Sequence, residues 1–581
     1  MKVQMIVTCI KIGLFLVSGF GYWEYFRSKH GIHIYFAPVF TLAVQFCILF
    51  AAGLLNCLGE AALVLYGVGF LLFLREAYQK RLRLFSPYWN PGYLYLALAL
   101  FGVGIMVQGK LFTQIDNFTH WATVVRNMLS TDRFPSFKEP VIEFISYPLG
   151  SSALIYFVCK MIGEAESMQM WAQAYVMLCT LLPVFSCCQK NKGAFWGLTV
   201  VMTGFLLNYN IPVTELLVDT LMPLVGMATA LFVYGHCSEK DGKTEFSPYY
   251  AIPLLIWTMN IKHAALIFVV LSLVLLYLYV GKQERDRKQW ALVAGSVLLA
   301  NVLWNRHCDY VFAGASGSRH SLSLGWFRTI LGEKTLEGIL ETVKMVLVRL
   351  ATRTECLWLM VWIFLLGILV WFGIREERKR YIRLLLCGVC LYGVYAIGIG
   401  AMYVFSMEDY GELLAFTRYM RSIDVAIYYM LTAYSGVLLS KLVKPQCAAG
   451  IGVALALLTA AGWYWQTGEY LKEPLACCSV EWRQELEHPI AKYDIQPGKT
   501  YLLCIRGDYH GWPRRIWRYN LKSVAVDQIV VTDADQLQIE KNYDYVVFLD
   551  WGNPVIEEWI QENYPDAIGS QVIEHLICSA E

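Results

Sequence analysis

The chain has 581 residues, of which 57% are hydrophobic and 16% are charged, and its formal net charge is +2. Soluble proteins have about a quarter of their residues charged, so this composition excludes an ordinary soluble protein and indicates a polytopic membrane protein. A net charge so close to zero predicts no nucleic-acid partner.

Apolar runs of roughly the length of a membrane helix recur along the chain, and we expect about 12 to 15 membrane helices. The runs cover residues 4–22, 33–55, 60–75, 92–109, 150–163, 168–187, 194–208, 217–235, 249–260, 264–281, 290–304, 355–373, 384–405, 424–441 and 448–465. The first is expected to be a retained helix, because no small-residue cleavage site follows it. The short runs at 150–163 and 249–260 could enter the membrane without crossing it. The 17 Cys are mostly within apolar runs, which predicts small buried side chains rather than disulfides or a metal cluster.

Clusters of Lys and Arg predict which loops are cytoplasmic. These clusters lie at 75–83, 190–192, 282–288, 375–383 and 441–444. The remaining polar segments are then expected on the outer face, namely the loops 110–149, 305–354 and 406–423 and the tail from 466.

The sequence changes character in this tail. It contains more charge, no long apolar run, a helical stretch at 556–563, and strand-like segments at 500–505, 523–526, 528–531 and 545–549. We therefore expect an all-α transmembrane domain over 1–465 and a small extracytoplasmic α/β domain over 466–581.

The first outer loop contains Asp116-Asn117-Phe118-Thr119-His120-Trp121. Asp116 and His120 are four residues apart, so on a helix they would share a face, where a carboxylate and an imidazole can activate a hydroxyl. Trp121 suits a sugar face or the headgroup level. An interfacial helix with solvated charges explains the same residues equally well. The run Asn117-Phe118-Thr119 is also an N-glycosylation sequon.

Two further sites combine charge with apolar surroundings. Glu215 and Asp219 begin an apolar run, where acids are costly unless they are solvated, paired or used. A favourable interaction with a helix N-terminus is the alternative explanation. Lys262 and His263 separate two apolar half-spans. A lysine there fits a phosphate, although it could equally reach towards water from a turn.

Three weaker groups remain. Arg418 precedes a late apolar run and could hold a phosphate or pyrophosphate. The loop 305–328 suits either a segment that closes over a ligand or an ordinary polar loop, and its polar residues include Arg306, His307, Asp309, Arg319 and His320. Solvated surface is expected for the charged turn in the tail that contains Arg506, Asp508, His510, Arg514 and Arg515. The sequence contains no phosphate-binding glycine loop, no zinc-ligand spacing and no hydrolase nucleophile motif.

This series of motifs resembles bacterial members of the GT-C superfamily of integral-membrane glycosyltransferases. The resemblance covers about residues 90–430 and is carried by Asp116 to Trp121, Tyr147-Pro148-Leu149-Gly150, Asp219, Lys262-His263 and Arg418-Tyr419. It implies an inverting transfer of a sugar from a polyprenyl-phosphate donor to a glycan, lipid or protein acceptor, at the outer face of the bacterial plasma membrane. The chain departs from many relatives in having Asn117 where they have a second acid. It also has three apolar runs before the one that leads into the loop, where the family often has one.

The resemblance also implies roles for individual residues. Catalytic roles are implied for Asp116 as general base, Asp219 and His120. Binding of the donor phosphate is implied for Lys262, Arg418 and His263. Contacts with the acceptor or the sugar are implied for Trp121, Glu215 and Tyr147. No cofactor is certain, and a divalent cation such as Mg²⁺ or Mn²⁺ is left open. The expected partners are the lipid-linked sugar, its acceptor and the membrane lipids.

A transporter or flippase for a polar or lipid-linked substrate is the main alternative, because intramembrane charges and half-spans are typical of such proteins. No internal symmetry of the kind common in transporters is visible. A membrane polysaccharide polymerase or ligase would perform similar chemistry on another fold, and a simple anchor for the tail would not need so many spans.

Overall fold

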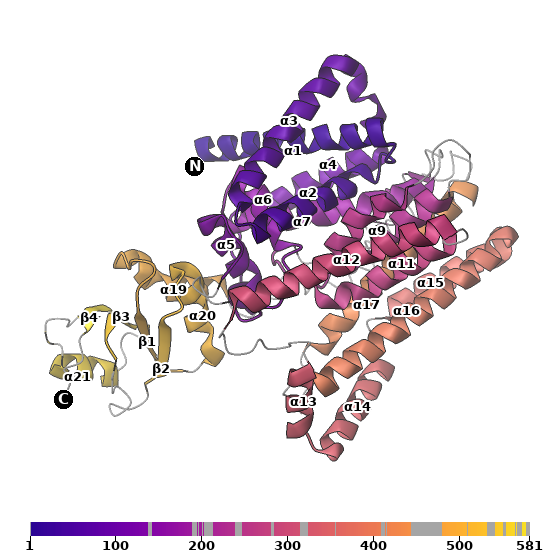
Figure 1. Ribbon diagram of the computed structural model, residues 1–581. Helices are drawn as coiled ribbons and strands as arrows, with labels where there is room; N and C mark the ends of the chain where they lie inside the picture. The colour runs from indigo at the N-terminus through magenta and orange to yellow at the C-terminus, as the bar shows by residue number, and fades with distance from the viewer. Residues whose placement is uncertain are drawn as a thin grey trace.

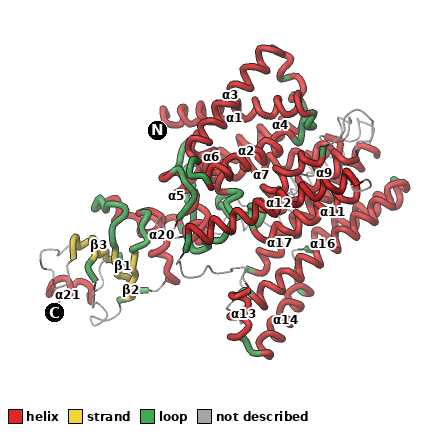
Figure 2. The backbone as a smooth tube through the Cα atoms, in the orientation of Figure 1, coloured by secondary structure: helices red, strands yellow, loops and turns green. Residues whose placement is uncertain are grey.

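A computed structural model of the chain shows a large helical part and a small sheet near the C-terminus (Figures 1 and 2). The residues described are 2–136, 142–188, 194–195, 197–199, 202, 213–238, 247–280, 284–313, 324–354, 356–407, 413, 415–442, 479–507, 509–531, 541–549, 554–563, 565 and 572–576.

Six of the described helices are long and apolar enough to cross a membrane. They are α1 (Lys2–His30), α2 (Ala37–Leu54), α3 (Leu58–Lys80), α7 (Glu166–Leu181) with the turn η4 (Leu182–Cys188) that continues it, α16 (Arg378–Phe405) and α17 (Phe416–Leu442). The prediction of a helical membrane protein is confirmed at this level. The larger number of crossing helices, about 12 to 15, stays a prediction.

The remaining helices of the bundle are α4 (Pro91–Val107), α5 (Ala122–Thr131), α6 (Ser152–Ile162), α9 (Leu221–Ser238), α10 (Ala251–Met259), α11 (Leu266–Val280), α12 (Glu284–Val311), α13 (Leu324–Glu333), α14 (Leu336–Ala351) and α15 (Leu357–Ile368). Single helical turns include η1 (Arg81–Leu84), η2 (Ser86–Tyr88), η3 (Asn117–Trp121), η5 (Pro248–Tyr250), η6 (His263–Ala265), η7 (Leu369–Gly373) and η8 (Arg375–Glu377).

The helices in the two short predicted runs, α6 and α10, are too short to cross a bilayer. α6 has 11 residues and α10 has 9, which gives lengths of about 16 and 13 Å against a hydrocarbon thickness of about 30 Å. The expectation that 150–163 and 249–260 could enter without crossing agrees with these lengths. Of the other predicted runs, 448–465 lies outside the described residues and 194–208 lies mostly outside them.

The prediction of a polar loop at 305–354 is wrong, because most of the described residues in this segment are helical. Helix α12 continues to Val311, and α13 and α14 form a helical hairpin beside α16 (Figure 1). Leu336, Leu340 and Leu347 recur at helical spacing along α14. The charged residues between these leucines made the segment resemble a polar loop, although its period is that of a helix.

Small residues bring α1 and α3 into close contact. A Cβ atom at Gly21 would lie 2.1 Å from the carbonyl oxygen of Gly69, and one at Gly69 would lie 2.1 Å from Oγ of Ser18. Only side chains of this size permit such an approach between membrane helices. Further along the same two helices, Lys80 Nζ lies 2.6 Å from the buried carboxylate of Glu24, so the helices run parallel.

Ion pairs also connect the start of α16 with the end of α17. Lys441 Nζ lies 2.9 Å from Glu376 and 2.6 Å from Glu377. The two helices are therefore antiparallel. Their Lys- and Arg-rich ends, at 375–383 and from 441, lie on the same side, as the predicted orientation requires.

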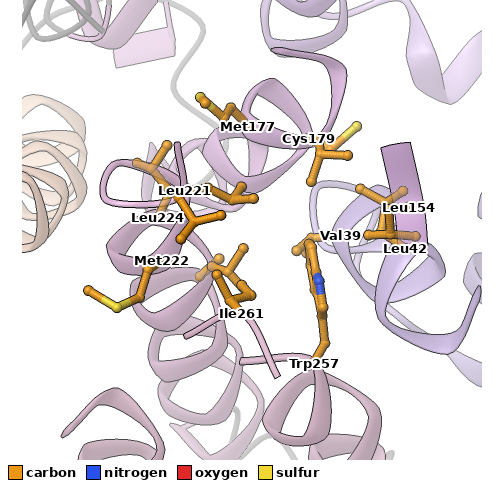
Figure 3. Close-up of a cluster of buried hydrophobic side chains, with 14 of the residues drawn as sticks. Val39, Leu42, Leu154, Met177, Cys179, Leu221, Met222, Leu224, Trp257 and Ile261 are labelled. Carbon is orange, nitrogen blue, oxygen red and sulfur yellow. The ribbon is translucent and has the colours of Figure 1, made fainter. Parts of the chain in front are cut away.

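A core of buried apolar side chains lies where several helices converge (Figure 3). Its residues include Val39, Leu42, Leu154, Met177, Cys179, Leu221, Met222, Leu224, Trp257 and Ile261. Leu221 follows Asp219 by two residues, and Ile261 directly precedes Lys262. Both apolar side chains are 0% exposed. Close packing of these neighbours fixes the backbone that carries the two charged residues.

The C-terminal part is a four-stranded sheet with helices on both faces. Its strands β1 (Tyr501–Ile505), β2 (Val526–Val530), β3 (Tyr543–Phe548) and β4 (Val572–Leu576) have the order β2-β1-β3-β4. β1 pairs in parallel with β2 and β3, whereas β4 is antiparallel to β3. The helices are α19 (Val480–Lys492), α20 (Trp512–Leu521), which follows the turn η9 (Tyr509–Gly511), and α21 (Pro554–Asn563).

Side chains of β1 alternate between the two faces of this sheet, as the period of a strand requires. Leu502 and Cys504 pack with Ile556 of α21, whereas Tyr501 and Leu503 pack with Trp517 of α20. The α/β prediction is confirmed for the described residues. The two segments predicted at 523–526 and 528–531 are a single strand, and β4, α19 and α20 were not predicted. The expected boundary at 466 lies outside the described residues.

Candidate functional site

Four charged side chains from distant parts of the sequence form a continuous chain. Arg418 Nη1 donates to Asp116 Oδ2 at 2.5 Å, and Arg418 Nε lies 3.6 Å from Asp219 Oδ2. Lys262 Nζ donates to Asp219 Oδ1 at 2.7 Å. Two carboxylates therefore alternate with two cations. The structure brings together the four residues on which the sequence interpretation most depends.

The loop that carries Asp116 is held to the segment before α9. Asp116 immediately precedes η3, a single π-helical turn. The next residue, Asn117, is 0% exposed, and its side-chain carbonyl accepts a hydrogen bond of 3.0 Å from the backbone N–H of Leu216. Asn117 therefore connects the Asp116 loop to the segment that carries Glu215 and Asp219. A buried asparagine is also no exposed acceptor for glycosylation, so the sequon is not available in the folded chain.

Lys262 lies at the break between two helices. α10 ends at Met259 and α11 begins at Leu266, and the N–H of Gly150 donates to Asn260 O at 2.6 Å within the break. A Cβ atom at position 150 would lie 2.4 Å from that oxygen. The glycine of the Tyr147–Gly150 motif is therefore required for the close approach of the two backbones that positions Lys262.

The charges of this site influence one another strongly. Burial lowers the pKa of Lys262, but the neighbouring carboxylate of Asp219 outweighs burial and raises the pKa above its usual value. Burial likewise raises the pKa of Asp219, and Lys262 and Arg418 together reverse this effect and lower it. Both cations also lie beside the ring of Tyr419, at 5.1 Å for Lys262 Nζ and 5.3 Å for Arg418 Cζ. Lys262 and Asp219 are therefore both charged at neutral pH.

Glu215 is a third acid beside this chain of charges. Its burial raises its pKa to about 7, and the negative charges of Asp219 and Asp116 act in the same direction, against Arg418. At neutral pH, Glu215 is therefore partly protonated, so it can donate a hydrogen bond as well as accept one.

Among the described residues, Asp116 pairs with Arg418, and His120 forms no hydrogen bond to it. The His120 ring is 0% exposed and packs against the rings of Trp121 at 4.7 Å and Tyr147 at 5.3 Å. Burial, with a smaller effect from Lys262, lowers the pKa of His120 to about 3. The imidazole is therefore neutral. Neither of its ring nitrogens has a hydrogen-bond partner among the described residues.

Trp121 and Tyr147, two of the residues predicted to contact the acceptor or the sugar, pack against this imidazole. Trp121 is 5% exposed and packs against the His120 ring, and its contact with a sugar stays a prediction. Tyr147 is half-buried and stacks on Phe144 with ring centroids 4.9 Å apart. His263 Nε2 lies 3.2 Å from the carbonyl oxygen of Ser146, which ties the same loop to the helix break.

Sequence reasoning missed a contact between the C-terminal domain and the Asp116 loop. Arg483 of α19 is 2% exposed, and its guanidinium donates to both carboxylate oxygens of Glu166, at 2.7 and 2.8 Å, and to Phe112 O at 2.7 Å. Tyr519 of α20 donates to Glu166 at 3.0 Å and packs against Phe118 with ring centroids 5.3 Å apart. The sequence signal was weak, because one arginine in a charged amphipathic helix resembles a surface residue.

The assignment of the Arg514-Arg515 pair to solvated surface is also wrong for Arg515. Its Nε donates to Glu143 at 2.8 Å, and both side chains are less than a quarter exposed. Glu143 in turn donates its backbone N–H to Thr119 O at 3.0 Å. By contrast, Arg306 and Asp309 of α12 are exposed and 3.9 Å apart, as expected of an ordinary polar surface. Arg319, His320 and Asp508 lie outside the described residues.

The binding of a divalent cation stays a prediction, and no set of ligands for it is seen among the described residues. In the part of the chain that the structure describes, no three His, Cys, Asp or Glu side chains are grouped as metal ligands. Asp116 and Asp219 instead face Arg418 and Lys262. Comparisons of the chain with protein-family models, with curated proteins and with solved structures each found no match.

Proposed function

We propose that this protein is an inverting membrane glycosyltransferase of the GT-C type. It moves a sugar from a polyprenyl-phosphate donor to a glycan, lipid or protein acceptor at the outer face of the bacterial plasma membrane. The observation that carries the proposal is the alternation of Asp116, Arg418, Asp219 and Lys262 beside membrane-length helices. A base and cations for an anionic leaving group are the two requirements of this reaction.

The proposed reaction uses this alternation directly. Asp116 accepts the proton of the acceptor hydroxyl as its oxygen attacks the anomeric carbon. The bond from that carbon to the donor phosphate breaks, and the phosphate leaves with its electron pair. Arg418 and Lys262 stabilise the added negative charge, for which preorganised cations are more effective than an acid.

Two secondary roles follow from the contacts of the site. Asp219 lies between the two cations, so it orients them before the donor arrives. Glu215, when protonated, donates a hydrogen bond to a sugar or acceptor oxygen. His120, neutral and buried, supports the loop through its packing with Trp121 and Tyr147 rather than by exchanging a proton.

The test is release of polyprenyl phosphate by the purified full-length protein. A panel of polyprenyl-phosphate-linked hexoses and pentoses is offered with membrane glycans as acceptor. Asp116→Asn is expected to lower the rate by about 10² to 10⁴, the range of general-base catalysis. Asp309→Asn, which removes an exposed acid, is the matched control and should retain full activity. Equal rates for wild type and Asp116→Asn would refute the role of Asp116.

One observation favours a transporter as the second candidate. The α10–α11 pair is broken at a lysine, and broken helices with exposed backbone groups are typical of substrate sites in transporters. Flux of labelled lipid-linked sugar into proteoliposomes distinguishes the two functions. A transporter would show flux without release of polyprenyl phosphate, and its flux would be insensitive to Asp116→Asn.

A further inference from the structure

Helix α20 presents three different surfaces. Ile516 and Tyr519 pack into the core of the helical bundle, and Trp517 and Leu521 pack against the sheet. The third surface carries the arginines at positions 514, 515 and 518. Residues three and four apart on a helix are neighbours, so the three guanidinium groups share one side of α20.

These arginines have far more positive charge than their surroundings neutralise. Glu143 forms an ion pair with Arg515 alone. Asp527, the other nearby acid among the described residues, accepts a hydrogen bond of 2.8 Å from Tyr543 and lies 3.5 Å from Lys541. Among the described residues, Arg514 and Arg518 form no ion pair, and their Nε atoms are buried without a hydrogen-bond partner.

The electrostatics agree with this geometry. Burial lowers the pKa of Arg518, and the positive charge of Arg514 lowers it further, against opposition from Glu143 and Asp527. Partly buried like charges repel one another at a free-energy cost unless an anion lies between them. An anion is therefore the ligand that this surface favours.

The surface lies close to the proposed active site. Glu143, the partner of Arg515, donates its backbone N–H to Thr119 O. The neighbouring Phe118 packs against Tyr519 on the same helix. Arg515 is therefore linked through Glu143 to Thr119, which follows Asp116 by three residues in the sequence.

A lipid headgroup fits this surface less well than a soluble polymer. Protein surfaces that bind membranes combine cations with exposed apolar side chains. In the described part of the C-terminal domain, the exposed large apolar residues are Tyr509 and Val524. We propose that Arg514, Arg515 and Arg518 form an anion-binding subsite that holds a carboxylate- or phosphate-bearing glycan acceptor beside the active site. This proposal rests on the proposed function.

The binding test uses the full-length protein in nanodiscs of neutral lipid. The probes are oligogalacturonate, which carries a carboxylate on each sugar, and an uncharged dextran oligosaccharide of the same length. We expect the acidic probe to bind with an affinity that falls with salt, and the dextran to bind at least about tenfold more weakly. The triple variant Arg514→Gln, Arg515→Gln, Arg518→Gln should lose about tenfold or more in affinity for the acidic probe.

Two further variants control for folding and for general charge. Replacing the same three arginines by lysines keeps the charge and should restore most of the affinity. The variant Lys492→Gln, Lys499→Gln, Lys522→Gln removes three exposed charges from the same domain and should bind like wild type. Equal affinity in the arginine-to-glutamine variant, equal binding of dextran, or a loss seen only with phosphatidylglycerol nanodiscs would overturn the subsite.

The outcomes also separate the subsite from the proposed reaction. Asp116→Asn should bind the acidic probe normally. With an acidic acceptor, the arginine-to-glutamine variant should raise the acceptor KM and leave kcat unchanged. If no donor releases polyprenyl phosphate, but the acidic probe still requires the three arginines, the reaction falls and the anion subsite stands. If the arginine-to-glutamine variant transfers sugar with the same acceptor KM as wild type, the subsite is refuted and the proposed reaction is not.

Discussion

At the scale of single residues, the site is a set of charges that compensate one another. Asp219 is the central member, because Lys262 lies 2.7 Å and Arg418 3.6 Å from its two carboxylate oxygens. Its side chain is 13% exposed, and that of Lys262 is 15% exposed. Removing one partner from such a pair leaves the other uncompensated, whereas removing both leaves no bare charge.

This compensation makes stability and activity separable at Lys262. Lys262→Met should lower the free energy of unfolding by about 3 to 5 kcal/mol, because Asp219 loses its nearest cation. The double variant Lys262→Met, Asp219→Asn should regain much of this stability and still release no polyprenyl phosphate. Thermal unfolding in detergent and the release assay measure the two effects. A double variant that is less stable than the single one would contradict this account of the ion pair.

Glu215 gives the protein a pH-dependent stability. Its folded-state pKa is raised from 4.5 to about 7, so the folded chain binds more protons than the unfolded chain within this window. The stability that the protonated Glu215 carboxyl contributes is therefore fully present below pH 4.5, and it is lost as the pH rises through about 7. Glu215→Gln should be more stable than wild type at about pH 8, by roughly 1 to 3 kcal/mol, and equally stable near about pH 4.

The measurement for Glu215 is the thermal midpoint of wild type and variant over this pH range in one detergent. Glu341→Gln, which alters an exposed acid of α14, provides the matched control and should change nothing. Parallel pH profiles for wild type and Glu215→Gln would show that Glu215 ionises freely in the folded protein.

At the scale of elements, the break between α10 and α11 depends on its contact with Gly150. The Gly150 carbonyl accepts a hydrogen bond of 3.0 Å from Trp257 Nε1, and its N–H donates to Asn260 O. Because residues 150 and 260 approach so closely, the loop that carries Tyr147 and the break that carries Lys262 form one unit.

Gly150→Ala should therefore disturb the site without altering any charged residue. The added methyl group would lie 2.4 Å from Asn260 O, and overpacking of this kind costs about 1 to 3 kcal/mol. We expect a lower thermal midpoint and a loss of sugar transfer. Gly102→Ala, where an added Cβ meets no atom within 4 Å, should be neutral. Normal transfer by Gly150→Ala would mean that Lys262 does not depend on this contact.

At the scale of the whole molecule, the C-terminal domain is part of the scaffold of the site. Arg483 connects α19 to Glu166 at the start of α7 and to Phe112 in the Asp116 loop. Arg483 is buried and pairs with Glu487 of its own helix, and its second pair, with Glu166, forms only while the domain is docked against the bundle.

Arg483→Met should loosen this docking. We expect hydrogen exchange to increase both in α19–α20 and in residues 112–121, together with a loss of stability of about 3 to 5 kcal/mol. Lys541→Met, at a side chain that is 74% exposed, is the control. Unchanged exchange over 112–121 would show that the loop holds its conformation without the domain.

The sequence was informative where a charge interrupts an apolar run. Lys262, between two apolar half-spans, and Asp219, at the start of an apolar run, were identified in this way, because a charge in such surroundings needs a partner. Arg418 was identified as a possible phosphate ligand that precedes a late apolar run. Arg483 was missed because it lies in a charged tail, where nothing distinguishes a buried arginine from an exposed one. The packing of His120 against Tyr147 was not foreseen, because the two residues lie far apart in the sequence. The ion pair between Asp116 and Arg418 joins residues 302 positions apart, which no local pattern encodes.

The contact of Arg483 with Phe112 spans 371 positions, which has a consequence for biogenesis. During synthesis, the Asp116 loop leaves the ribosome long before α19 and α20, so it lacks this contact while most of the bundle is being inserted. A polypeptide that ends before residue 483 would contain all four charged residues of the site but would lack the contact of Arg483 with Phe112. On the proposed function, chains that lack α19 and α20 are therefore expected to transfer sugar more slowly than the full-length protein.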